Sequence, residues 1–198
     1  MNNYPQYAMV NGRKYKINTD FRYAIRCNQI AMDETIGDTE RALGLLVTLF
    51  GEKGIDYPED YEKLLEIAKK YLCCGEEPIQ GEKQDMDFVQ DEKYIKSSFK
   101  YDYNYDPYKE KYVHWYEFYN DLSNLSNSEI GDCCILNRIR NLRNFDTSKI
   151  KDQDEKRKIE KAKKMVALHN IEQPRKEFTD EEIRNMEEFD RLMNRKEW

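Results

Sequence analysis

The residue types that most often carry catalysis are scarce in this sequence, and their spacing does not suit a reaction. The 198 residues contain two histidines, His114 and His169, and five cysteines. Four of the cysteines form two adjacent pairs, Cys73–Cys74 and Cys133–Cys134. Zinc sites usually separate paired cysteines by two to four residues, so that both thiolates reach one tetrahedral ion. We therefore expect the cysteines to be small buried hydrophobic residues, with no metal bound.

Neither histidine has the sequence surroundings of a catalytic base. His114 lies beside Trp115 in an aromatic segment, and His169 follows a basic segment, where a cation would complement a helix dipole. The chain lacks the patterns GxGxxG, GxxxxGK[ST], GxSxG and HExxH. An enzyme would need a cluster of polar groups in a deep pocket, and the sequence offers none. The sequence predicts a protein that is not an enzyme and has no cofactor.

The composition excludes several further classes of protein. There are 39 acidic and 33 basic residues, a net charge of −6, which disfavours nucleic acid as a partner. The longest mostly apolar run, Ala42–Phe50, is far shorter than the about 20 residues of a membrane span. The chain starts without the basic-then-apolar order of a secretory signal. Leu, Ile, Val and Phe make up about 21% of the residues, a thin core that leaves surface for a partner.

The order of turn signals and apolar periods predicts a mainly α fold. Asn11-Gly12 between short alternating runs predicts a small β-hairpin over residues 8–17, because both residues tolerate positive φ. A body of about six helices follows, and an extended C-terminal helical arm begins near residue 149. We therefore divide the chain into a helical body, residues 1–148, and a charged helical arm, residues 149–198. The helices of the body are expected between Asp20 and Gly37, from Asp38 or Thr39 to Phe50, and over residues 58–74, 88–101, 111–125 and from Ser126 onward.

Two of these helices are expected to pack on each other. The helix of residues 58–74 and that of residues 111–125 both carry apolar residues at i, i+3 and i+4. The second has the stripe Tyr112, Trp115, Tyr116, Tyr119 and Leu122. We predict that Trp115 is buried against residues 58–74.

The density of aromatic side chains is the most unusual feature of the sequence. Residues 101–119 contain seven tyrosines, one tryptophan and one phenylalanine. Core packing is one interpretation, and a protein-binding surface is another, because Tyr and Trp are enriched at interface hot spots. Stacking on nucleic-acid bases is disfavoured by the surrounding carboxylates. The candidate partner-binding residues of this segment are Tyr103, Tyr105, Tyr108 and Tyr116.

The arm carries a second signal for association. Residues 149–170 have a net charge of +4, and residues 171–198 have a net charge of −3. The last segment has a narrow apolar stripe that includes Phe189 and Met193, and we add both to the candidate partner-binding residues. Two solvated helix faces, packing back on the body, and self-association are all compatible with this pattern. A nucleic-acid-associated regulatory protein that uses the basic helix 149–164 is the alternative function.

Several segments, taken in order, resemble one family of phage proteins. The most specific are INTDFR at residues 17–22 and HWYEF at residues 114–118. The second is similar to a His-Trp-Trp-Lys-Phe type segment of that family, from which Tyr116 and Glu117 depart. The family is encoded ahead of the tape-measure gene in long-tailed phages and prophages of Gram-positive bacteria, and its members are taken to be tail assembly chaperones. The resemblance covers about residues 8–170.

The resemblance implies a non-enzymatic chaperone in the cytoplasm of the bacterial host. Such a protein binds the tape-measure protein and helps the tail-tube protein to polymerise around it, with self-association expected. We expect INTDFR to be a structural junction, in which Thr19 or Asp20 caps a helix, Phe21 packs and Arg22 pairs with an acid. Trp115 and Phe118 of the second motif are likewise expected to be structural.

Overall fold

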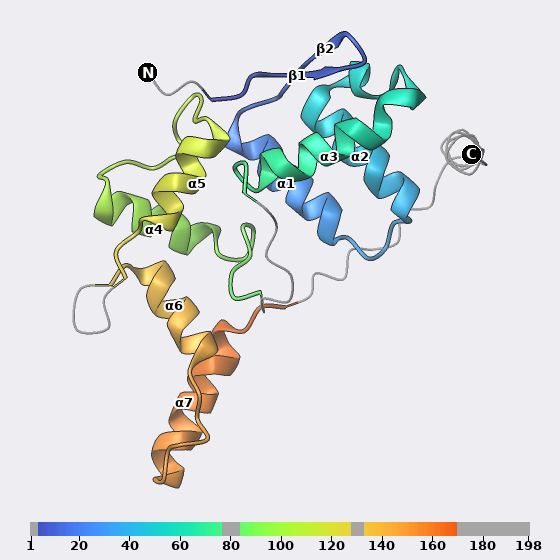
Figure 1. The fold of residues 1–198 in the computed structure, drawn as a ribbon. Helices are drawn as coiled ribbons and strands as arrows, with labels where there is room; N and C mark the ends of the chain where they lie inside the picture. Colours follow the sequence, from blue (N-terminus) through green and yellow to red (C-terminus); the bar gives the residue numbers. More distant parts are fainter. Residues whose placement is uncertain (1–3, 77–83, 128–132, 170–198) are drawn as a thin grey trace. The chain divides into compact units, whose positions relative to one another are not determined.

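The computed structural model describes residues 4–76, 84–127 and 133–169, and it confirms a mainly α fold with an N-terminal hairpin (Figure 1). Packing groups the described residues into two compact units. The first contains residues 4–76 and 114–116, and the second contains the remaining described residues from 84 to 169. The predicted division at residue 148 stays a prediction. Among the described helices, none is both long and apolar enough to cross a membrane.

The hairpin of the first unit has the predicted turn. Strands β1 (Tyr7–Val10) and β2 (Arg13–Lys16) pair antiparallel, with Val10 opposite Arg13. Asn11 and Gly12 have φ of 47° and 78°, the positive values that a type I′ turn requires. The side chains alternate along the strands, which buries Ala8, Val10 and Tyr15 on one face.

Three α-helices complete most of the first unit. They are α1 (Phe21–Met32), α2 (Asp38–Phe50) and α3 (Tyr61–Leu72), with short 3₁₀ helices η1 (Glu52–Ile55) and η2 (Pro58–Asp60) between α2 and α3. Asp20 caps α1, because its carboxylate accepts the backbone N–H of Arg22 at 3.0 Å. The Arg22 guanidinium pairs with the same carboxylate at 2.9 Å, and Phe21 is fully buried. INTDFR thus forms the start of a helix, as expected, with Asp20 rather than Thr19 as the side-chain cap.

A buried carboxylate joins the hairpin to the 3₁₀ helix η2. Asp60 accepts hydrogen bonds from Asn11 Nδ2 at 2.6 Å, from Arg13 at 3.0 Å and from the Tyr15 hydroxyl. Burial by itself raises the pKa of Asp60, but the three hydrogen bonds together outweigh it and hold the pKa below the usual 3.8.

We predict that Asp60→Asn destabilises the chain at neutral pH and that the loss fades in acid. A carboxylate with a lowered folded pKa stabilises the fold above its unfolded pKa of about 3.8, and the contribution is lost as pH falls through the folded pKa. Thermal unfolding of both proteins between pH 7 and pH 2 measures the difference. Asp56→Asn, an exposed neighbour, is the control, and a difference between wild type and Asp60→Asn that does not change with pH would contradict the assignment.

Helix α5 (Trp115–Ser123) begins four residues later than the predicted helix of residues 111–125. His114 forms an antiparallel bridge with Asp20, and this extended backbone delays the helix. The buried stripe is Trp115, Phe118 and Leu122, and the expected members Tyr112, which lies before the helix, and Tyr119 are exposed. Trp115 itself is buried as predicted, and its Nε1–H donates to the Leu72 carbonyl at 3.2 Å.

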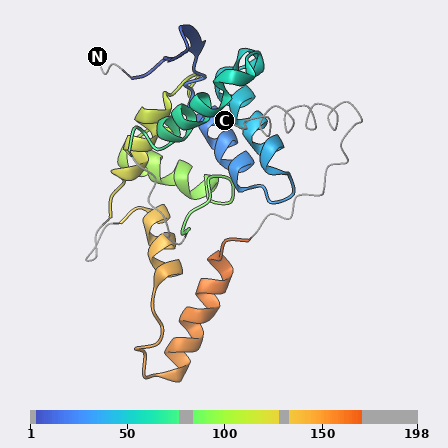
Figure 2. The ribbon, with the colours of Figure 1, turned by 45° about the vertical axis from the view of Figure 1, so that its right-hand side comes forward.

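The second unit is built from α4 (Glu92–Asp102), the remainder of α5, α6 (Ile135–Asn144) and α7 (Gln153–Val166). Phe99 and Phe118 stack with ring centroids 5.3 Å apart in its core. Helix α6 starts at Ile135 after the N-cap Cys134, and not at Ser126, where the sequence predicted a helix to begin. The C-terminal ends of α6 and α7 meet, and the linker between the two helices runs alongside α7, so that the segment forms a hairpin (Figure 1 and Figure 2).

Candidate interaction surface

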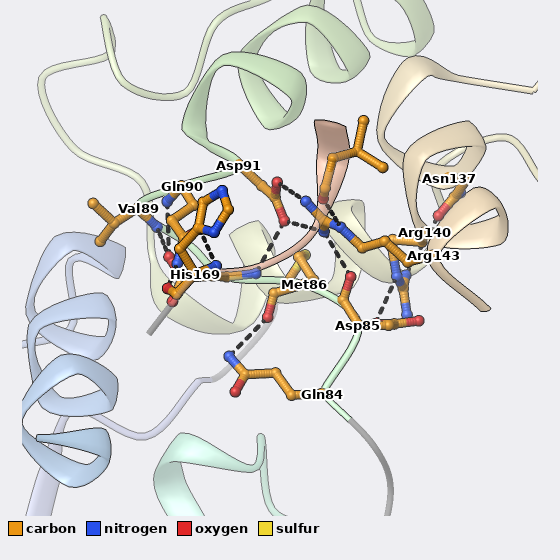
Figure 3. Close-up of polar contacts among 12 residues, drawn as sticks. Gln84, Asp85, Met86, Val89, Gln90, Asp91, Asn137, Arg140, Arg143 and His169 are labelled. Carbon is orange, nitrogen blue, oxygen red and sulfur yellow. Dashed lines mark hydrogen bonds and ion pairs between the residues drawn. The ribbon is translucent and has the colours of Figure 1, made fainter. Parts of the chain in front are cut away.

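A buried ion pair anchors the α6–α7 hairpin to the loop that precedes α4. The Asp91 carboxylate receives two hydrogen bonds from the Arg143 guanidinium, both at 2.7 Å (Figure 3). The two side chains are 1% and 9% exposed. The hydrogen bonds to Asp91 raise the pKa of Arg143, so the guanidinium stays charged in its buried position.

Arg143 also extends this contact to both sides. Its Nε donates to the Val166 carbonyl at the end of α7 at 2.6 Å, and one amino group donates to the Asp85 carbonyl at 2.7 Å. The Asp85 carboxylate in turn accepts from Arg140 and Asn144 of α6, each at 3.0 Å. One arginine therefore connects the loop before α4, helix α6 and the C-terminal end of α7.

The segment after α7 is held by a side-chain amide. Gln90 accepts the backbone N–H of His169 at 2.9 Å, and its amide donates to the carbonyl of the same residue (Figure 3). The side chain pairs with His169 much as a second peptide group would in a β-bridge. His169 therefore lies beyond the end of α7, and its hydrogen bonds with Gln90 are made by its backbone N–H and carbonyl.

Helix α7 is anchored without being buried. Asp152 caps its N-terminus by accepting the N–H groups of Asp154 and Glu155, at 2.8 and 3.2 Å. None of its fourteen residues is buried, and Met165 is 78% exposed. Its half-buried positions face the rest of the unit, and its exposed positions include four cations. These cations are Arg157, Lys158, Lys161 and Lys164.

A cavity of about 520 Å³ lies at the C-terminal end of α7. Ala167 and Leu168 give it an apolar side. The remaining lining residues are polar or charged: Gln84, Arg143, Asn144, Lys163 and Lys164. Pockets of this size hold large side chains or small ligands, so the cavity is a candidate binding site beside an exposed helix.

A family model described as Bacteriophage Gp15 protein matches residues 3–168. The chain belongs to this phage family. Searches of the curated proteins and of the solved structures give no match. The family match ends at Leu168, so it includes the whole α6–α7 hairpin and the cavity in this Gp15-family chain.

Three of the candidate tyrosines of the Gp15-family chain, Tyr103, Tyr105 and Tyr108, are half-buried within the second unit. The hydroxyls of Tyr103 and Tyr105 both donate to Asp121, one to its carbonyl at 2.9 Å and the other to its carboxylate at 2.7 Å. Burial raises the pKa of both phenols. Tyr108 meets Phe118 edge-on with ring centroids 6.4 Å apart. The role of these residues in binding a partner stays a prediction, and their visible contacts are those of packing.

The remaining candidates lie elsewhere. Tyr116 belongs to the first unit, where its ring lies 5.1 Å from that of Tyr71, and burial raises its pKa to about 12. Phe189 and Met193 lie outside the described residues. Among the described residues, no group of three or more His, Cys, Asp or Glu side chains is placed to hold a metal ion.

The cysteines are less buried than the sequence suggested. Cys27 and Cys134 are buried, whereas Cys73, Cys74 and Cys133 are half-buried, and all five thiols are free. Burial raises the pKa of Cys27 and of Cys74 to about 12, which keeps these two thiols protonated. Protonated thiols are poor nucleophiles and poor metal ligands.

Proposed function

We propose that this chain is a tail assembly chaperone that binds the tape-measure protein in the cytoplasm of a Gram-positive host. The observation that carries the proposal is the α6–α7 hairpin, an anchored helical platform inside the region that matches the phage family. Its second helix has no buried residue and so offers its surface to a partner. The motifs INTDFR and HWYEF add the family resemblance that suggests this role.

The physical requirements of the role agree with this surface. A tape-measure protein exposes apolar helix stripes until the tail tube encloses them. A carrier has to cover those stripes reversibly, which favours modest contacts to a helix over one deep pocket. Exposed methionines such as Met165 suit such contacts, because their side chains are unbranched and adaptable. Many copies along one tape measure would add avidity, and the tail-tube protein would replace them.

The basic exposed positions of α7 are the one observation that favours a nucleic-acid-associated regulatory protein. The net charge of −6 and the exposed carboxylates of Asp154 and Glu155 on the same helix oppose it. We therefore place this function second.

We predict that co-expression with the full-length chain keeps the tape-measure protein of the same phage soluble. The tape measure made alone is expected to precipitate, because its apolar stripes are exposed. With the chaperone, the two proteins should co-elute in size-exclusion chromatography with several chaperone chains for each tape measure. Static light scattering of the eluted peak gives the ratio.

An unrelated acidic protein of similar size, expressed at the same level, is the control for simple dilution. The proposal would be refuted if the tape measure precipitates equally in both cultures and the chaperone neither co-elutes nor co-precipitates with it.

A further inference from the structure

We propose that the exposed face of α7 and the adjoining cavity bind an acidic amphipathic helix that carries one large apolar side chain. The exposed face is defined by Arg157, Lys158, Lys161, Lys164 and Met165. The inference rests on the proposed function and names the kind of tape-measure segment that this surface would receive.

The cations of the exposed face form one continuous row. Arg157, Lys161 and Lys164 are spaced i, i+4 and i+7, so they lie on the same side of the helix. Arg157 has only a loose pair with Asp154, at 3.7 Å between two well-exposed side chains. Within the described part of the chain, Lys158, Lys161 and Lys164 have no acidic partner within 4.0 Å. The charge of this face is therefore available to carboxylates of another molecule.

The cavity supplies an apolar anchor point at the end of the row. Lys164 belongs both to the exposed face and to the cavity lining, so the two features are continuous. Ala167 and Leu168 would contact an apolar side chain, while Lys163 and Asn144 give a polar rim. An anchor in a pocket with a polar rim is the usual arrangement of an interface hot spot.

The surface is also held in place before a partner arrives. Arg143 binds the carbonyl of Val166, and Gln90 binds the backbone of His169, on either side of the two apolar lining residues. Binding a helix here would require little further ordering of the chain, which lowers the entropic cost of association.

A protein helix fits the exposed face better than nucleic acid does. A phosphate backbone would offer no apolar side chain to contact Met165 or the apolar side of the cavity. The exposed carboxylates of Asp154 and Glu155 would repel phosphates at the N-terminal end of the same helix. An acidic helix can place its carboxylates along the row of cations and its apolar residue at the cavity.

The test compares two triple variants of the full-length chain. The face variant is Lys158→Glu, Lys161→Glu and Lys164→Glu, and the control variant is Lys100→Glu, Lys109→Glu and Lys111→Glu. All six lysines are exposed and belong to the second unit, so both variants change the net charge equally. The probes are a fluorescent Glu-rich amphipathic helical peptide with one Phe anchor and the same peptide with Lys in place of Glu, followed by fluorescence anisotropy.

We expect the wild type and the control variant to bind the acidic peptide alike and the basic peptide at least tenfold more weakly. The face variant should lose at least tenfold in affinity for the acidic peptide. Ala167→Trp, which fills the cavity without a change of charge, should weaken binding of the Phe peptide but not of the same peptide with Ala as anchor. Far-UV circular dichroism checks that each variant is folded.

Equal binding of the acidic peptide to the face and control variants would overturn the inference. If both variants then still keep the tape measure soluble, the chaperone function stands and only this site is wrong. If even the wild type fails to keep it soluble, the chaperone function itself fails. A random-sequence DNA duplex that binds the face at about 150 mM salt more tightly than the acidic peptide would also overturn it, in favour of nucleic acid.

Discussion

Replacement of Trp115 by alanine is expected to lower the free energy of unfolding by about 3–5 kcal/mol. The indole is 3% exposed, and its Nε1–H donates to the Leu72 carbonyl at the end of α3. The substitution therefore leaves a cavity and an unpaired carbonyl together. For a chain of this length, the loss corresponds to a fall in melting temperature of about 6–20 °C. Urea denaturation followed by far-UV circular dichroism measures it.

Two further substitutions separate burial from aromatic content. Trp115→Phe keeps most of the packing and loses the hydrogen bond, so it should cost clearly less than the alanine variant. Tyr101→Ala removes a ring that is 64% exposed and should change stability by no more than about 0.5 kcal/mol. A melting temperature of Trp115→Ala equal to that of the wild type would exclude this residue from the core.

The second large effect is expected from Asp91→Ala, which should cost about 3–5 kcal/mol. The substitution leaves the Arg143 guanidinium charged and nearly buried, with its carboxylate partner gone. Because Arg143 also binds the Val166 carbonyl, the loss should reach the α6–α7 hairpin. Hydrogen exchange measured by mass spectrometry should show faster exchange over α7 than in the wild type.

The control for this prediction is an exposed ion pair of the same unit. Glu92→Ala removes the partner of Lys96 on the surface of α4 and should cost less than about 1 kcal/mol. The double variant Asp91→Leu with Arg143→Met should recover part of the loss, because no charge is then left buried. Similar stabilities of Asp91→Ala and Glu92→Ala would show that the Asp91 pair has no structural role.

Local sequence determined the elements whose signals lie within a few residues. Asn11-Gly12 specified the hairpin turn, since only residues that tolerate positive φ fit both positions. Asp20 specified the start of α1, because a carboxylate at that position reaches the N–H two residues later. The apolar spacing of residues 58–74 likewise specified α3 and the face that it buries.

Tertiary structure alone decided the direction of the aromatic side chains. Tyr103 and Tyr112 lie in the same aromatic segment, yet the Tyr103 hydroxyl donates to the Asp121 carbonyl and Tyr112 is 54% exposed. Spacing favoured Tyr112 for the buried stripe, but α5 begins only at Trp115, after His114, which forms a bridge with Asp20, so Tyr112 lies before the helix. A contact made by a residue 94 positions earlier in the chain therefore set the helix start and left Tyr112 outside the helix.

The candidate interaction surface depended on tertiary structure in the same way. Asp91 and Arg143 are 52 residues apart, and Gln90 and His169 are 79 residues apart. Neither pair stands out locally, because a carboxylate, an arginine or an amide is usually solvated in so charged a chain. The sequence by itself predicted a basic helix with few apolar residues over residues 149–164, and α7 covers Gln153–Val166. Only the folded chain buries the charges that hold this helix in place, because burying them requires partners from distant segments to meet.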